Sequence, residues 1–343
     1  MTKLAVIVLN WNGESLLREF LPSVVENSSC DGVEIWVADN ASADASEQLV
    51  KAGFPTVKWL AFDKNYGFAG GYNRALKHID CTYALLLNSD VMVPAGWLDP
   101  LLRVLDTESD VAACAPKLRD YKNPAKFEYA GASGGFLDKN CYAFCRGRMF
   151  HDIEFDTGQY DDETEVFWAS GAALMVRRSE YLRFGGLDED FFAHMEEIDL
   201  CWRMKNSGLK IKIVPSSVVY HVGGATLSET SPFKTYLNFR NNLLMMYKNL
   251  PEKGFTTVLF KRKVLDTLAM GVMLLKFDFK NAIAVVRAHL HYYRMVRNTY
   301  RHKRKICLLE ATSRNETGII RRNVVFLHFT GKLRCFNELE KFI

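Results

Sequence analysis

Short apolar runs recur through the first part of the chain and constrain its fold more than any other feature. They cover residues 4–9, 33–37, 57–61 and 83–87, and each has the length of a strand that is buried on both faces. Helical patterns follow them, first at residues 16–25 and then at 43–52, 68–79 and 95–106. Strands that alternate with helices predict an α/β fold, with a mainly parallel sheet flanked by helices.

Polar loops follow these predicted strands. In such sheets, ligands bind beyond the carboxyl ends of the strands. The loops there are Asn10-Trp11-Asn12-Gly13, Asp39-Asn40-Ala41-Ser42, Asn65-Tyr66-Gly67 and Asn88-Ser89-Asp90. Any one of them could simply build a turn, because Asn, Asp, Gly and Ser favour turns. Four such loops in succession indicate a binding site.

Two strand ends offer metal ligands. Asp90 follows the apolar run that ends at Leu87, and His221 ends a later predicted strand over residues 211–220. A lone histidine is more often structural than a ligand. Magnesium, however, takes few protein ligands and keeps waters and phosphate oxygens, so one carboxylate and one imidazole could hold it beside a diphosphate.

An acidic segment precedes a predicted helix that continues to about residue 206. It places Asp188, Glu189, Asp190, Glu196, Glu197 and Asp199 within twelve residues. Acids at a helix start usually complement the helix dipole. Six of them beside a predicted site exceed that need, and a general base is the use that we expect.

Other cofactor motifs are absent from the sequence. No G-x-G-x-x-G follows the first predicted strand, and no P-loop lysine occurs. Nicotinamide-dependent and ATP-hydrolysing activities are therefore disfavoured.

Taken together, the blocks resemble family-2 glycosyltransferases, and more narrowly a subgroup of bacterial rhamnosyltransferase-like enzymes that build surface polysaccharides. The resemblance spans about residues 3–250. Besides the loops above, it rests on Gly67-Phe68-Ala69-Gly70-Gly71 with Asn73, L-L-L-N-S-D at 85–90, Ser170-Gly171-Ala172, G-G-L-D-E-x-F-F at 185–192, E-E-x-D-L-C-W-R at 196–203, and His221.

The resemblance implies a GT-A fold and inverting transfer of a sugar from a nucleoside diphosphate to an acceptor hydroxyl. The positions that match the nucleotide site are Asn10, Trp11, Asn12, Asp39, Asn65, Gly67, Asn88, Ser89 and Asp90. Those that match the sugar and acceptor site are Ser170, Gly171, Ala172, Asp188 and Glu196. Asp90 and His221 match ligands of a divalent metal, Mg²⁺ or Mn²⁺, and Glu197 matches the catalytic base.

Two residues depart from the family pattern. Asn88 replaces the first Asp of the D-x-D motif, which favours a deoxysugar donor such as rhamnose, and Glu197 replaces the more common Asp. A sugar nucleotidyltransferase is an alternative, but it would need a basic glycine-rich loop after the first strand. A non-catalytic nucleotide-sugar-binding protein is another, suggested by Asn88 and opposed by Asp90, Glu197 and His221.

Positive charge concentrates in the last part of the chain. Residues 251–343 hold 19 Lys and Arg against 7 Asp and Glu, whereas the whole chain carries only +4. This segment is expected to be a largely helical extension to a catalytic domain over residues 1–250. Its one apolar stretch, residues 264–275, is too short to cross a bilayer. The pattern favours contact with an anionic membrane surface over a plain helical subdomain, and no recognition motif supports nucleic acid.

The eight cysteines form no C-x-x-C pair, and the N-terminal apolar run is too short for a signal peptide. We therefore expect a cytoplasmic protein, peripheral on the inner face of the cell membrane, with a glycan or lipid-linked acceptor.

Overall fold

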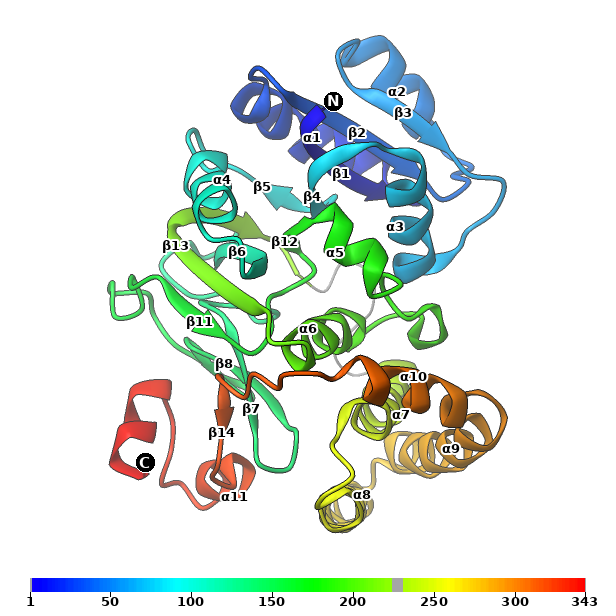
Figure 1. Cartoon of the computed structure of the whole chain (residues 1–343), viewed down its shortest axis with the longest axis vertical. Coiled ribbons are helices and arrows are strands. Elements are labelled where there is room, and N and C mark those ends of the chain that lie inside the picture. Colours follow the sequence, from blue (N-terminus) through cyan, green and yellow to red (C-terminus); the bar gives the residue numbers. More distant parts are fainter. Residues whose placement is uncertain (1, 224–230, 343) are drawn as a thin grey trace.

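A large mixed β-sheet forms the centre of the protein (Figure 1). The computed structural model describes residues 2–223 and 231–342. Within them the strand order is β11-β13-β6-β12-β4-β1-β2-β3, with β5 paired to β13. The strands are β1 (Thr2–Asn10), β2 (Val33–Asp39), β3 (Lys58–Ala61), β4 (Cys81–Asn88), β5 (Val91–Met92), β6 (Val111–Asp120), β11 (Thr164–Val166), β12 (Ala173–Arg177) and β13 (Lys210–His221).

The N-terminal half of this sheet is parallel, as the alternating pattern predicts. β1 pairs in parallel with both β2 and β4, and β2 pairs in parallel with β3. Asn10 lies opposite Asp39, and Leu9 lies opposite Asn88. The polar residues that follow these strands therefore meet at one edge of the sheet.

The other half is mixed. β12 runs antiparallel between β4 and β6, and β11 runs antiparallel to β13. β12 begins only at Ala173, although the apolar run FWASGAALMV over residues 167–176 reads as one strand. Of the residues before β12, Trp168, Ser170, Gly171 and Ala172 line a cavity.

Helices cover both faces of the sheet. Successive side chains of a strand point to opposite faces, so the apolar side chains of these strands need a covering layer on each side. One face packs against α1 (Glu14–Ser28), α2 (Ser46–Gly53) and α4 (Leu98–Thr107). The opposite face packs against α3 (Gly67–His78), α5 (Arg178–Arg183) and α6 (Glu196–Asn206), and α7 (Pro232–Asn249) packs against α6. On β1, for example, Leu4 belongs to the first core and Ala5 to the second.

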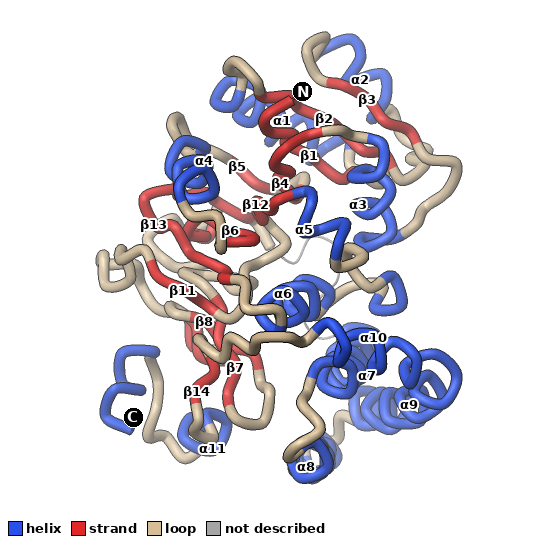
Figure 2. The backbone as a smooth tube through the Cα atoms, in the orientation of Figure 1, coloured by secondary structure: helices blue, strands red, loops and turns tan. Residues whose placement is uncertain are grey.

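A second, five-stranded sheet joins distant parts of the chain (Figure 2). Its order is β10-β9-β8-β7-β14. It contains β7 (Gly135–Asp138), β8 (Ala143–Cys145), β9 (Arg148–Met149), β10 (Asp152–Ile153) and β14 (Ile319–Ile320). β14 pairs in parallel with β7, so the basic C-terminal segment contributes a strand as well as helices. Short α11 (Val324–Phe329) follows it.

The basic segment also builds a helical layer. α8 (Phe255–Leu275), α9 (Phe279–Met295) and α10 (Arg301–Glu310) lie beside α7 (Figure 1). None of the helices in the described ranges combines the length and the apolar character needed to cross a bilayer. The domain boundary at residue 250 stays a prediction, and α7, which precedes it, packs against α9, which follows it.

A buried ion-pair network attaches this helical layer to the catalytic part. Asp188 was expected among the sugar and acceptor residues, but its carboxylate lies 2.7 Å from Lys248 Nζ on α7 and 2.6 Å from Lys303 Nζ on α10. Lys248 also pairs with Asp199 on α6 at 2.7 Å. Burial opposes ionisation of Asp188, but the two lysine charges outweigh it and lower the pKa of the carboxyl. The structure therefore gives Asp188 a role in holding helices together.

Replacing Asp188 with Asn should lower the free energy of unfolding by about 3 kcal/mol, because it leaves buried lysine charges incompletely paired. Urea unfolding measures this change. The control is Glu47→Gln, which removes an exposed pair with Lys51 on α2 and should cost less than about 1 kcal/mol. Equal effects of the two substitutions would show that the network does not stabilise the fold.

Candidate functional site

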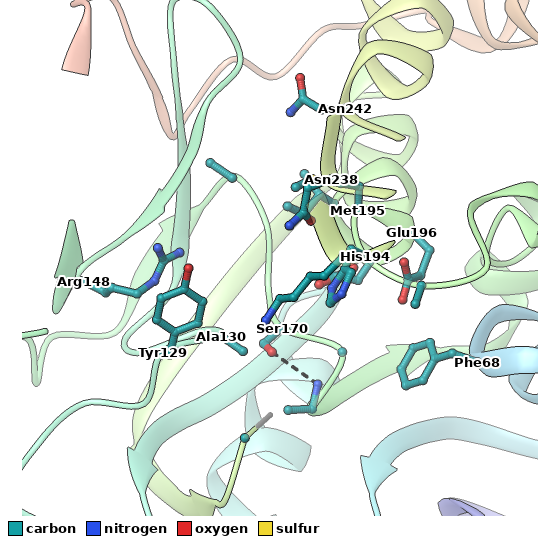
Figure 3. A pocket seen from close by; sticks show the side chains of 18 of the residues that line it. Phe68, Tyr129, Ala130, Arg148, Ser170, His194, Met195, Glu196, Asn238 and Asn242 are labelled. Carbon is teal, nitrogen blue, oxygen red and sulfur yellow. Dashed lines mark hydrogen bonds between the residues drawn. The ribbon is translucent and has the colours of Figure 1, made fainter. Parts of the chain in front are cut away.

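A cavity of about 2120 Å³ opens at the carboxyl ends of the central strands. It extends between the two sheets and the helical layer, and Figure 3 shows part of its lining. Most of the predicted site residues line it: Asn10, Trp11, Asn12, Asn65, Gly67, Asn88, Ser89, Asp90, Ser170, Gly171, Ala172, Glu196, Glu197 and His221. Asp39 and Asp188 are absent from this lining.

Asp39 joins the first two polar loops by hydrogen bonds, although it does not itself line the cavity. Its carboxylate accepts hydrogen bonds from Asn10 Nδ2 at 2.8 Å and from the Ser42 hydroxyl at 2.5 Å. The Ser42 hydroxyl oxygen in turn accepts from the backbone N–H of Asn12 at 2.8 Å. The side chain of Asp39 is buried, so in this structure it fixes the loop that presents the exposed ring of Trp11.

The glycine-rich turn serves helix packing. A Cβ on Gly71 would lie 2.5 Å from the Leu9 side chain, so glycine lets α3 approach β1 closely. Asn73, two residues later, accepts from the backbone N–H of Leu187 at 2.9 Å and donates to its carbonyl at 2.8 Å. These bonds tie the start of the acidic segment to α3.

Asp90 and His221 converge at the cavity wall. Asp90 Oδ1 lies 3.1 Å from His221 Nε2, and the other ring nitrogen lies 3.2 Å from Glu128 Oε1. The Asn88 amide is 3.4 Å from His221 Nε2. A carboxylate on the far nitrogen is the usual way to orient a metal-binding histidine. Glu128 was not predicted, because it lies in an irregular segment without a sequence signal.

The surroundings of His221 favour a positive charge. Burial opposes protonation of the ring, but the hydrogen bonding and negative charges of Asp90 and Glu128 outweigh it and raise the pKa of His221 to about 10. The same pair of carboxylates would favour a bound cation. No cluster of three or more His, Cys, Asp or Glu side chains able to hold a metal occurs in the described parts of the chain. A two-ligand arrangement fits a hard cation that completes its shell with water and phosphate oxygens.

Two adjacent glutamates begin α6 inside the cavity. The Glu196 side chain is almost fully buried, and Glu197 is partly exposed. One carboxylate oxygen of each has no hydrogen-bond partner. Burial raises the pKa of Glu197 to about 7. Burial and the charge of Glu197 raise the pKa of Glu196 well above its usual value. Near neutral pH, Glu197 is therefore the better proton acceptor.

The loop before these glutamates is held in an unusual backbone conformation. Phe192, His194 and Met195 all have positive φ angles, of 66°, 68° and 75°. Such angles are unfavourable for residues with side chains unless their surroundings enforce them.

Two residues of α7 hold that loop. The Asn241 amide donates to the carbonyls of Phe191, Ala193 and His194 at 2.8–2.9 Å. Arg240 donates to the carbonyls of Asp190 and Phe191. Neither residue was predicted, although a buried Arg-Asn-Asn run within an apolar helix is a signal that could have found them.

The remaining cavity wall is partly basic. Figure 3 shows Arg148 and Tyr129 on one side of the cavity and His194 and Glu196 on the other, with Ser170 between them. The Ser170 hydroxyl oxygen accepts from the backbone N–H of Ala172 at 3.3 Å. Arg148 was not predicted, because it lies on a two-residue strand of the second sheet. The cavity thus brings together unpaired carboxylates, a possible cation site and a buried guanidinium.

Comparison with known proteins identifies relatives that bear on this site. The N-acetylglucosaminyl-diphospho-decaprenol L-rhamnosyltransferase of Mycobacterium tuberculosis is 26% identical over 234 residues, which cover 64% of this chain and 75% of that protein. Rhamnosyltransferase WbbL of Escherichia coli K12 is 22% identical over 225 residues, which cover 63% of this chain and 82% of that protein.

Solved structures share the fold at low identity. The Staphylococcus aureus TarS fragment 1–349 in complex with UDP-GlcNAc has a TM-score of 0.57 at 14% identity, over 96% of this chain and 92% of that one. GalNAc-T7 with UDP, GalNAc and Mn²⁺ has a TM-score of 0.57 at 14% identity, over 72% of this chain and 48% of that one. The expected GT-A fold is therefore confirmed.

The family model for glycosyl transferase family 2 matches residues 5–180. This match includes β1 to β4 and the loop with Asp90, and it extends over more than half of the 343 residues. Together with the named relatives, it shows that the protein is a glycosyltransferase that belongs to family 2.

Proposed function

We propose that the protein transfers a sugar from a nucleoside diphosphate to an acceptor hydroxyl, with inversion at the anomeric carbon. The observation that carries this proposal is the presence of Glu197 and the Asp90–His221 pair in one cavity. The acceptor oxygen bonds to the anomeric carbon as the bond to the diphosphate breaks. The electron pair leaves with the nucleoside diphosphate, and the hydroxyl proton passes to Glu197.

Glu197 is suited to that proton transfer. A general base works best when its pKa lies near the working pH, and burial raises the pKa of Glu197 to about 7. Glu197 lines the cavity, and one of its carboxylate oxygens, itself buried, has no hydrogen-bond partner among the described residues. Asn241 and Arg240 support this position by fixing the loop before it.

A divalent cation, Mg²⁺ or Mn²⁺, would be held by Asp90 and His221 Nε2. When bound, such an ion supplies positive charge that stabilises a departing diphosphate. Glu128 Oε1 lies 3.2 Å from the other ring nitrogen of His221 and places a negative charge beside it. GalNAc-T7 and a Pyrobaculum calidifontis mannosyltransferase share the fold, and their solved structures contain Mn²⁺. Both support a divalent cation in this site.

A deoxyhexose such as rhamnose is the proposed donor sugar. The two relatives described above carry rhamnosyltransferase names, at 22–26% identity, and Asn88 agrees with that subgroup. The alternatives, a sugar nucleotidyltransferase and a non-catalytic binding protein, lose support because the family match and the named relatives are glycosyltransferases.

Asp90→Asn should abolish most transfer and should remove its dependence on added Mg²⁺ or Mn²⁺. The physical reason is the loss of one charged ligand beside the diphosphate. The measurement is release of nucleoside diphosphate from a panel of sugar nucleotides, with and without chelator. Asp99→Asn, at an exposed position on α4, is the control. Full activity in excess chelator would contradict the metal proposal.

Glu197→Gln should lower kcat by about two to four orders of magnitude, the usual contribution of a general base. Glutamine keeps the shape of the side chain but cannot accept the proton. Binding of the nucleoside diphosphate, measured by calorimetry, should stay unchanged.

Wild-type kcat/KM should rise with pH up to about 7 and then level off, because the ionised Glu197 is the active form. Glu196→Gln serves as the matched neighbour control. If Glu196→Gln is inactive and Glu197→Gln is not, the assignment of the base is wrong by one residue.

We also propose that the protein binds the cytoplasmic face of an anionic membrane through α8 and α9. These helices and the turn between them expose apolar side chains: Phe260, Val264, Leu268, Val272, Leu274, Leu275, Phe277, Phe279, Ile283, Val286 and Leu290. Exposed cations flank them, among them Lys261, Lys276, Lys280, Arg287 and Arg294. Apolar patches rimmed by polar residues mark contact surfaces, and nearby Lys or Arg adds about 1 kcal/mol each on an anionic bilayer.

The double substitution Leu275→Glu with Phe277→Glu should release the protein from anionic vesicles in a co-sedimentation assay. Leu275 and Phe277 are 81% and 79% exposed, so the substitutions should leave the fold intact. Leu182→Glu, an exposed position on α5, is the matched control. Wild-type protein that ignores anionic vesicles at low salt would contradict the membrane proposal.

A further inference from the structure

We infer that the same cavity contains a second anion-binding subsite, centred on Arg148, which receives the phosphate of a lipid-linked acceptor while a groove between α8 and α11 receives its lipid chain. This inference rests on the proposed function and names the acceptor class for it.

Arg148 is a buried cation whose hydrogen-bonding capacity is only partly used. Its side chain is 7% exposed and lines the cavity. The guanidinium donates to the Phe150 carbonyl at 3.1 Å and lies 3.5 Å from Cys145 Sγ. Its Nε has no hydrogen-bond partner. No carboxylate of the described residues forms an ion pair with it.

Three other buried arginines form ion pairs with aspartates of the same chain. Arg146 pairs with Asp162, Arg203 with Asp199 and Arg262 with Asp266. Burying a charge is costly unless a partner compensates it. Arg148 therefore has no carboxylate at ion-pair distance, and the charge of Glu128 acts on it only from farther away. A bound anion could supply a direct partner.

The surroundings of Arg148 suit a phosphate group. Its guanidinium lies 4.6 Å from the Tyr129 ring centroid, and Lys234 Nζ lies 5.9 Å from the same centroid. Lys234 also lines the cavity. A planar guanidinium can donate two parallel hydrogen bonds to phosphate oxygens, and a lysine adds positive charge.

α8 and α11 add mainly apolar residues to the cavity lining, with Lys276 and Asn323 among the polar residues next to them. α8 contributes Leu265, Leu268 and Val272, and α11 contributes Val325, Phe326 and Phe329. Leu268 and Phe329 are 61% and 70% exposed, so this end of the cavity opens at the apolar surface of α8. One cavity therefore offers a place for each part of such an acceptor. The polar groups would receive the sugar, the buried cation the phosphate, and the apolar groove the lipid chain.

The subsite can be tested by binding, without the natural acceptor. Geranylgeranyl diphosphate is the probe, and its affinity for the full-length protein is measured with Mg²⁺ and saturating nucleoside diphosphate present. Arg148→Gln should weaken its binding at least tenfold, and Arg148→Lys should weaken it less. Leu268→Glu should weaken binding of this probe but leave binding of inorganic pyrophosphate unchanged.

Several results would overturn the inference. The first is that geranylgeranyl diphosphate competes with the nucleoside diphosphate for binding. The second is that Arg148→Gln and wild type bind the lipid probe with equal affinity. The third is that pyrophosphate binds as tightly as the lipid probe. Retained nucleoside diphosphate binding shows that each variant is folded. Failure of the proposed function would instead appear as absent nucleotide binding in the wild type.

Discussion

The hydrogen bonds from Asn241 to the chain before α6 are the interaction on which the candidate site depends. The three carbonyls that this amide contacts belong to a loop in which Phe192, His194 and Met195 have positive φ. Each such residue costs about 1–3 kcal/mol and persists only where its surroundings enforce it. Asn241 lies on α7, and α7 is anchored by the pairing of Lys248 with Asp188 and Asp199. α7 therefore helps to build the candidate site.

This arrangement explains the acidic segment better than a single role could. Six acids lie near the start of one helix in the sequence. In the structure some of them form ion pairs and others do not. Asp188 and Asp199 are neutralised by lysines and stabilise helix packing. Glu196 and Glu197 have no cationic partner among the described residues and face the cavity, where burial raises the pKa of both. Unpaired buried carboxylates are costly, and such sites are common where chemistry needs a shifted pKa.

Sequence patterns predicted the parallel strands and their polar ends because both follow from local rules. A strand buried on both faces must be apolar, and residues after parallel strands must meet at one edge. Asp90 and His221 were nominated as candidate ligands because each lies at a strand end, and the family resemblance matched both to a metal site, since 131 positions separate them and no periodicity links them. Glu128, Arg148 and Asn241 were missed because tertiary packing, rather than local pattern, brings them to the cavity. The pairing of β14 with β7 was missed for the same reason.

The stereochemistry of the product tests the central claim most directly. A single displacement with Glu197 as base forms no covalent sugar–enzyme intermediate, so each transfer must invert the anomeric carbon. The measurement is the anomeric configuration of the product by NMR, using the donor that supports turnover in the sugar-nucleotide panel. The account predicts a configuration opposite to that of the donor. A product that retains the donor's configuration would contradict it.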